Sequence, residues 1–315
     1  MSRDRVLEIP GGDARRPESA GRELPRGGRS GSAKRAGQSP AREGRDALVR
    51  QLDLPQGDTR ERVWADQGSY SLRGSEVRTL AAVGAFRVVN VDDLGTERGA
   101  DRWRGDLEHL RQNGLIEIRP HVLEGHRSCV ATLTAAGKTL LEHHQSAGAD
   151  EARQNYYAGL VKPREVPHDA AIYRAYQATA ARLQGGGARI RRVVLDYELK
   201  REYQRFLQAN NRGNRHASGR PDRSPDEIAA WAAAHKLPVE DGHVQFPDVR
   251  VEYEQDGRLE REDVEVATAQ YTARQMGAKG RSGFTIHRSG TSRLGGNSRN
   301  GASPFDPHAA EQVLR

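Results

Sequence analysis

Cysteine is almost absent from this chain, which has one, Cys129, among 315 residues. An intramolecular disulfide needs two cysteines and a cysteine zinc cluster needs several, so the sequence excludes both. Cys129 stands in "SCVATLT", a pattern typical of a strand. We therefore expect its side chain to pack in a core.

Hydrophobic residues are also scarce, at 35% of the chain, and aromatic residues make up only 5%. Because such a composition cannot bury the whole length, we expect disordered or solvated segments beside folded ones. No run approaches the roughly 18 apolar residues of a membrane-spanning helix. The start, rich in arginine and glycine, lacks the apolar section of a signal peptide. We expect a cytoplasmic protein with no membrane partner.

Basic residues exceed acidic ones, with 50 Lys and Arg against 43 Asp and Glu, a net charge of +7 and a pI near 9.7. Such a balance favours a polyanionic partner, because neutralised phosphates release their condensed counterions. No basic amphipathic helix with a bulky apolar face stands out, so nucleic acid is favoured over a membrane surface. The alternative is that a GC-rich genome has enriched the chain in arginine, which would explain the high pI without a polyanionic partner.

Composition divides the chain into arms and folded parts. Residues 1–70 are rich in Gly, Arg, Pro and Ser and predict a disordered basic arm, and residues 289–315 predict a second disordered tail. Residues 148–167 predict a linker, since Pro163 and Pro167 favour extended geometry before them. Two folded domains are therefore expected, over residues 71–147 and 168–288.

The first expected domain begins with helical patterns. Ser75 and Asn90 are predicted caps of two helices, "GADRWRGDLEHLRQNG" predicts a third, and Gly114 ends it. Two strands, "LIEIRPHV" and "RSCVATLT", and a last helix capped by Thr134 follow. This order resembles a winged-helix domain, the helix-turn-helix type that ends in a hairpin.

The resemblance implies that the third helix enters the major groove of duplex DNA. The expected DNA-binding residues are exposed arginines of that helix and of the hairpin: Arg98, Arg102, Arg104, Arg111 and Arg127. The alternative is that these arginines form a solvated face of a domain used for dimerisation or protein contact, because a fold supplies only an analogy for function.

The second expected domain has the order helix, strand, insertion, two strands, helix, strand, which resembles the restriction-endonuclease-like, or PD-(D/E)XK-like, core. The resemblance implies a metal held by Asp248, after a proline, and by Glu265 in the next strand. Two carboxylates and a scissile phosphate can hold Mg²⁺. Ala267 stands where the family has its assisting lysine, which leaves Lys279, Arg274 or Gln270 to replace it from the following helix.

Glu198, in "LDYELKRE", has two interpretations. It could complete an acidic cluster with Asp248 and Glu265. We favour the other interpretation, in which Glu198 pairs with a neighbouring basic residue on a solvated helix.

Taken together, residues 72–288 resemble the replication-relaxation family of plasmids and integrative elements. The fold expected is α+β: a winged-helix domain, then a small α/β nuclease-like domain, between disordered termini. The function expected is a non-enzymatic DNA-binding protein of mobile-element replication or transfer, whose degenerate nuclease-like domain serves docking or dimerisation.

Two other functions stay open: a metal-dependent endonuclease with Asp248 and Glu265 as ligands, and a winged-helix transcriptional regulator. Expected partners are double-stranded DNA, a relaxase or replication protein, and a second copy of the chain. No cofactor is expected, apart from Mg²⁺ if the nuclease-like site is active, because the histidines show no metal-ligand spacing.

Overall fold

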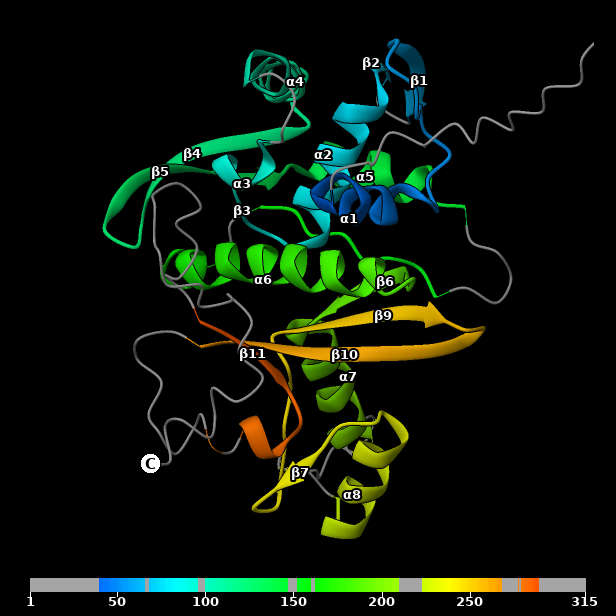
Figure 1. Ribbon diagram of the computed structural model, residues 1–315, viewed down its shortest axis with the longest axis vertical. Coiled ribbons are helices and arrows are strands. Elements are labelled where there is room, and N and C mark those ends of the chain that lie inside the picture. The colour runs from blue at the N-terminus through cyan, green and yellow to red at the C-terminus, as the bar shows by residue number, and fades with distance from the viewer. Residues whose placement is uncertain are drawn as a thin grey trace, which may run out of the picture. The chain divides into compact units, whose positions relative to one another are not determined.

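The computed structural model describes residues 40–65, 68–95, 100–146, 152–159, 162–209, 223–267, 277 and 279–288. All of them belong to one compact unit that spans Gln38–Arg315. They form a mixed α+β fold of helices and several small sheets (Figure 1). The segments expected to be disordered at 1–39 and 289–315 lie outside the described residues.

A helix and a hairpin precede the first expected domain. They are α1 (Pro40–Val49), β1 (Glu61–Ala65) and β2 (Gly68–Leu72). The prediction of a disordered arm up to residue 70 is wrong for this stretch. Its few apolar side chains are concentrated enough to be buried, namely Ala47, Leu48, Val49, Leu52, Leu54 and Val63. A low average hydrophobicity concealed this local concentration.

Helices and a three-stranded sheet follow in the order expected from the sequence. The elements are α2 (Gly74–Ala85), β3 (Val89–Asn90), α3 (Val91–Leu94), α4 (Ala100–Gln112), β4 (Ile116–Leu123), β5 (His126–Leu133) and α5 (Ala135–His143). The strands lie in the order β3-β5-β4, all antiparallel. The predicted hairpin is therefore confirmed as β4 and β5.

Two of the three predicted helix caps, Asn90 and Thr134, form in the structure. Asn90 accepts a hydrogen bond from the Asp92 N–H, and Thr134 accepts one from the Gly137 N–H at 3.0 Å, so both caps are confirmed. Ser75 is not a cap. Helix α2 begins one residue earlier, and the backbone N–H of Arg73, the residue before it, donates to the Glu76 carboxylate at 3.0 Å.

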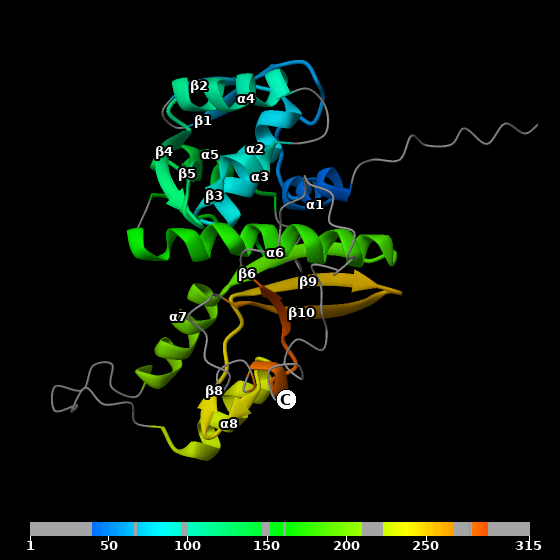
Figure 2. The ribbon, with the colours of Figure 1, turned by 60° about the vertical axis from the view of Figure 1, so that its left-hand side comes forward.

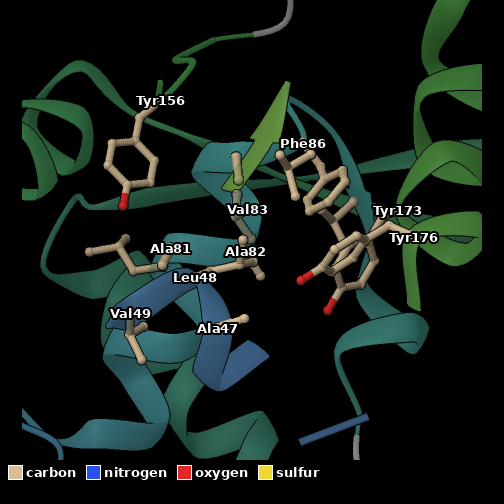
Figure 3. Packing of buried hydrophobic residues seen from close by; sticks show 14 of the residues in the cluster. Ala47, Leu48, Val49, Ala81, Ala82, Val83, Phe86, Tyr156, Tyr173 and Tyr176 are labelled. Carbon is tan, nitrogen blue, oxygen red and sulfur yellow. The ribbon is translucent and has the colours of Figure 1, made fainter. Parts of the chain in front are cut away.

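Helix α6 (Val166–Gly185), preceded by the 3₁₀ turn η1 (Pro163–Glu165), lies between these helices and a second sheet (Figures 1 and 2). Tyr173 and Tyr176 pack on Phe86, with ring centroids 5.1 and 4.8 Å away (Figure 3). On its other side α6 contacts β6, β9 and β10. The largest apolar cluster therefore includes residues of both stretches expected to be separate domains.

The second sheet has the strand order β11-β10-β9-β6. Its strands are β6 (Arg189–Leu195), β9 (Val249–Gln255), β10 (Arg258–Ala267) and β11 (Thr285–Arg288). Strands β10 and β11 are parallel and the other pairs antiparallel. Strand β9 begins directly after Asp248.

On the side of the sheet away from α6 lie α7 (Asp196–Leu207) and, beyond it, α8 (Pro225–Ala234) and the small hairpin β7 (Val239–Glu240) and β8 (His243–Val244) (Figure 1). Alternation along β6 explains both faces: Val193 joins the main cluster, whereas Val194 packs with Leu199 and Ala232. Ser224 caps α8. The helix expected after β10 falls almost wholly outside the described residues.

Part of the expected linker is packed into the fold. Gln154 is buried, and its side-chain amide exchanges two 2.9 Å hydrogen bonds with the backbone of Val193. Tyr156 is buried as well. The linker prediction is thus wrong for these residues, because a glutamine that pairs with a strand has no signature in composition.

In the part of the chain that the structure describes, no helix is long and apolar enough to cross a membrane.

Candidate functional site

An open groove of about 510 Å³ lies between α3, α4 and the β4–β5 hairpin. Trp103, Leu107 and Ile118 give it an apolar part, and Arg104 and Arg127 also line it. These two arginines come from the helix and from the hairpin that the sequence predicts as a DNA-binding surface. Folding therefore brings together two of the five predicted arginines.

Arg104 and Arg127 are exposed, and neither forms an ion pair with another described residue. The guanidinium carbon of Arg104 lies 5.8 Å from the centre of the Trp103 ring. Since a guanidinium is always charged and donates several hydrogen bonds, two such groups on one groove suit an anionic ligand.

Acidic residues line the same groove, but they have partners. Glu108 accepts hydrogen bonds from Arg111, at 2.7 Å, and from Gln112, and these bonds lower the pKa of its carboxyl to about 2. Asp92 accepts a hydrogen bond from Ser128. Arg111, one of the predicted DNA-binding residues, is thus engaged by Glu108 on the exposed face of α4.

Ion pairs to buried carboxylates connect α4 and α2 to neighbouring segments. Arg73 donates from Nε to Asp106 of α4 at 2.9 Å, and Arg60 donates from Nε to Glu76 of α2 at 3.0 Å. Both carboxylates are buried. The Arg73–Asp106 pair joins α4, which carries Arg104, to the residue before α2, whereas the Arg60–Glu76 pair connects Arg60 to α2.

The other predicted DNA-binding residues and Cys129 lie as follows. Arg98 lies outside the described residues, and so does the side chain of Arg102. Cys129 is exposed on the groove, contrary to the expectation of core packing. It lies opposite Pro120 on the outward face of the hairpin, whereas its neighbour Val130 points inward. Because successive side chains of a strand point to opposite faces of the sheet, Cys129 faces outward when Val130 faces the core.

A second group of predicted residues lies at one end of the β9–β10 pair. The register pairs Val249 with Val264, so Asp248 and Glu265 occupy the next positions along the two chains. Asp248 accepts a hydrogen bond from the Val266 N–H at 2.8 Å. Glu265 is only 1% exposed. The sequence-predicted carboxylates are therefore close in the fold and largely removed from water.

Each of these carboxylates contacts a basic side chain. His168, at the start of α6, donates to Asp248 at 3.2 Å. Lys279 lies with its Nζ 3.1 Å from Glu265 Oε1 and donates to the Phe246 carbonyl at 2.7 Å. Lys279, expected as one of three substitutes for the missing lysine, thus reaches Glu265. Arg274 and Gln270, the other two, lie outside the described residues.

The charge on His168 depends on its acidic neighbours. Burial alone would lower its pKa, but hydrogen bonds to Asp169 and Asp248, together with their charges, outweigh it and raise the pKa to about 10. Asp169 also lies 3.8 Å from a guanidinium nitrogen of Arg87. At neutral pH His168 is therefore a cation between two carboxylates.

Glu198 is buried, at 3% exposed, and the preferred solvated interpretation is wrong. It accepts hydrogen bonds from the Tyr157 hydroxyl at 2.5 Å and from Asn155. Burial, followed by the charge of Glu198, raises the pKa of Tyr157. Both partners come from the expected linker, where "NYY" is a polar and aromatic signal that could have drawn attention to it.

The donor set gives no cage for a metal ion. Among the described residues, no three or more His, Cys, Asp and Glu side chains gather as metal ligands would. Two carboxylates that already contact cations do not fit Mg²⁺ as they stand, because the ion would compete with His168 and Lys279 for the same oxygens.

Comparison with known proteins finds no matching family model, no similar curated protein and no similar solved structure. The resemblance to the replication-relaxation family therefore stays a prediction.

Proposed function

We propose that this protein binds duplex DNA through the groove between α4 and the β4–β5 hairpin, acting as a winged-helix protein. One observation carries the proposal: Arg104 and Arg127, from two different elements, line one open groove without an ion pair to any other described residue. Exposed guanidiniums bind phosphates and release counterions from DNA.

The sheet of β6, β9, β10 and β11 would support the DNA-binding part and dock a partner, such as a second copy, a relaxase or a replication protein. A role in replication or transfer of a mobile element rests on the sequence resemblance alone.

Binding of a fluorescent duplex across a salt series tests the proposal. Each lost phosphate contact reduces the slope of log K against log salt by about 0.9. The Arg104→Ala/Arg127→Ala variant is therefore expected to bind more weakly, with a slope reduced by nearly two such steps. Arg258→Ala, which removes an exposed arginine at the start of β10, is the matched control. Equal binding by all three proteins would refute the groove assignment.

A second candidate function is a metal-dependent endonuclease. The observation that favours it is that the ammonium of Lys279 lies beside Glu265, although the sequence has Ala267 at the usual lysine position. In such an enzyme Mg²⁺ would have to displace Lys279 and His168 from the two carboxylates. Nicking of supercoiled plasmid with Mg²⁺ or Mn²⁺ decides it, using Asp248→Asn and Lys279→Met. Asp248→Asn keeps an oxygen that can accept from Val266. Nicking lost in both variants would support the enzyme, and its absence in the wild type would exclude it.

A further inference from the structure

The β1–β2 hairpin is fixed beside the proposed DNA-binding helix. His109 of α4 donates from Nε2 to the Ser71 carbonyl at 2.9 Å, and His144 donates to the Trp64 carbonyl at 2.7 Å. Val63 and Leu72 anchor the inner face of the hairpin in the core. Figure 1 shows the hairpin next to α4, with the β4–β5 hairpin extending from the other side of that helix.

The outer face of this hairpin carries a row of exposed side chains. The register pairs Arg62 with Ser71 and Trp64 with Ser69, and directly opposite residues share a face. All four are exposed, and Trp64 is 64% exposed. A serine is too small to cover an indole, so the cross-strand neighbour leaves the ring open.

The guanidinium of Arg62 lies over this ring, with its Cζ 5.6 Å from the ring centre. It forms no ion pair with another described residue. The outer face thus combines an open aromatic ring, a cation and two hydroxyl groups. This is the set that holds an unpaired nucleotide, because the ring stacks on a base while the cation and hydroxyls bind phosphate.

We propose that the outer face of β1–β2 binds single-stranded DNA that continues from the duplex held by α4. The proposal rests on the proposed function, since the duplex places the strand near the hairpin. Stacking needs an unpaired base, because both faces of a base inside a duplex are already covered by its neighbours. The preferred ligand is therefore a duplex with a single-stranded extension.

Anisotropy measurements on one duplex, blunt or extended at either its 3′ or its 5′ end, test this proposal. The wild type is expected to bind one of the extended forms more tightly than the blunt form. Removing an aromatic ring that stacks on one base weakens binding about fivefold or more. Trp64→Ala should lose that gain yet bind the blunt duplex as the wild type does. Trp64→Phe, which keeps a ring, should retain most of it.

Tyr197→Ala is the matched control. Tyr197 is another half-exposed aromatic side chain, with the guanidinium of Arg201 at 5.8 Å, but it lies on α7. This variant should keep the preference for the extended duplex.

The outcomes distinguish a failure of the proposed function from a failure of the hairpin site. A wild type that binds no duplex refutes the proposed function. A wild type that binds the blunt duplex but shows no preference, or a Trp64→Ala variant that keeps it, refutes the hairpin site alone. If Trp64→Ala instead changes the oligomeric state measured by light scattering and leaves the preference intact, the hairpin is an interface between copies and the proposal is overturned.

Discussion

The α4 groove and the end of the β9–β10 pair both contain charged residues that the sequence predicts as site residues. The two groups differ in exposure and in ion pairing. In the groove, Arg104 and Arg127 are exposed and unpaired among the described residues. At the strand ends, Asp248 and Glu265 are buried and contact basic side chains. A charge already matched inside the protein contributes to the fold, whereas an unmatched surface charge is available to a ligand.

The largest expected effect on stability comes from removing the Glu265 carboxylate. Glu265→Ala would leave Lys279 as a mostly buried cation without this partner, and breaking a buried pair costs about 3–5 kcal/mol. Urea unfolding should show a free energy of unfolding lowered by that amount. The double variant Glu265→Leu/Lys279→Met should recover much of it, because it leaves no unpaired charge. An unchanged stability in Glu265→Ala would mean that this carboxylate does not serve the fold.

A smaller effect is expected from His168, through pH. Its folded-state pKa lies above the usual value, so the protonated ring stabilises the fold fully below pH about 6.5, and the contribution declines as the pH rises through about 10. A hydrogen bond to a charged group is worth about 1.5–3 kcal/mol. The stability difference between wild type and His168→Gln should shrink over this range. A difference that stays constant from pH 6 to 10 would contradict the assignment.

The smallest effect on stability is expected in the groove. Arg104→Ala/Arg127→Ala should change the free energy of unfolding by less than about 0.5 kcal/mol per substitution, since surface substitutions rarely do more. The same protein should show the loss of DNA binding described above. Thermal unfolding measured beside the binding assay checks this, and a strongly lowered melting temperature would show that the arginines also support the fold.

Local features were the part of the fold that could be predicted. Asn90, Thr134 and Ser224 cap helices through contacts within three residues, so their roles follow directly from short stretches of sequence. The order of helices and strands from α2 to α5 followed from such signals.

Features that depend on distant partners could not be predicted. Glu198 is buried because Asn155 and Tyr157 reach it from about forty residues earlier in the chain. Arg60 and Glu76 tie a segment expected to be disordered to α2. Lys279 was one of three alternatives, and only the folded chain places its ammonium beside Glu265.

The position of helix α6 bears on how this protein unfolds. Because Tyr173 and Tyr176 close over Phe86 while the same helix contacts β6, β9 and β10, both layers depend on one element. A fragment ending at residue 146 would expose Phe86 to water and would aggregate or stay partly unfolded. In hydrogen exchange, the amides of α2 and of the sheet should therefore open together in one cooperative event rather than as two independent modules.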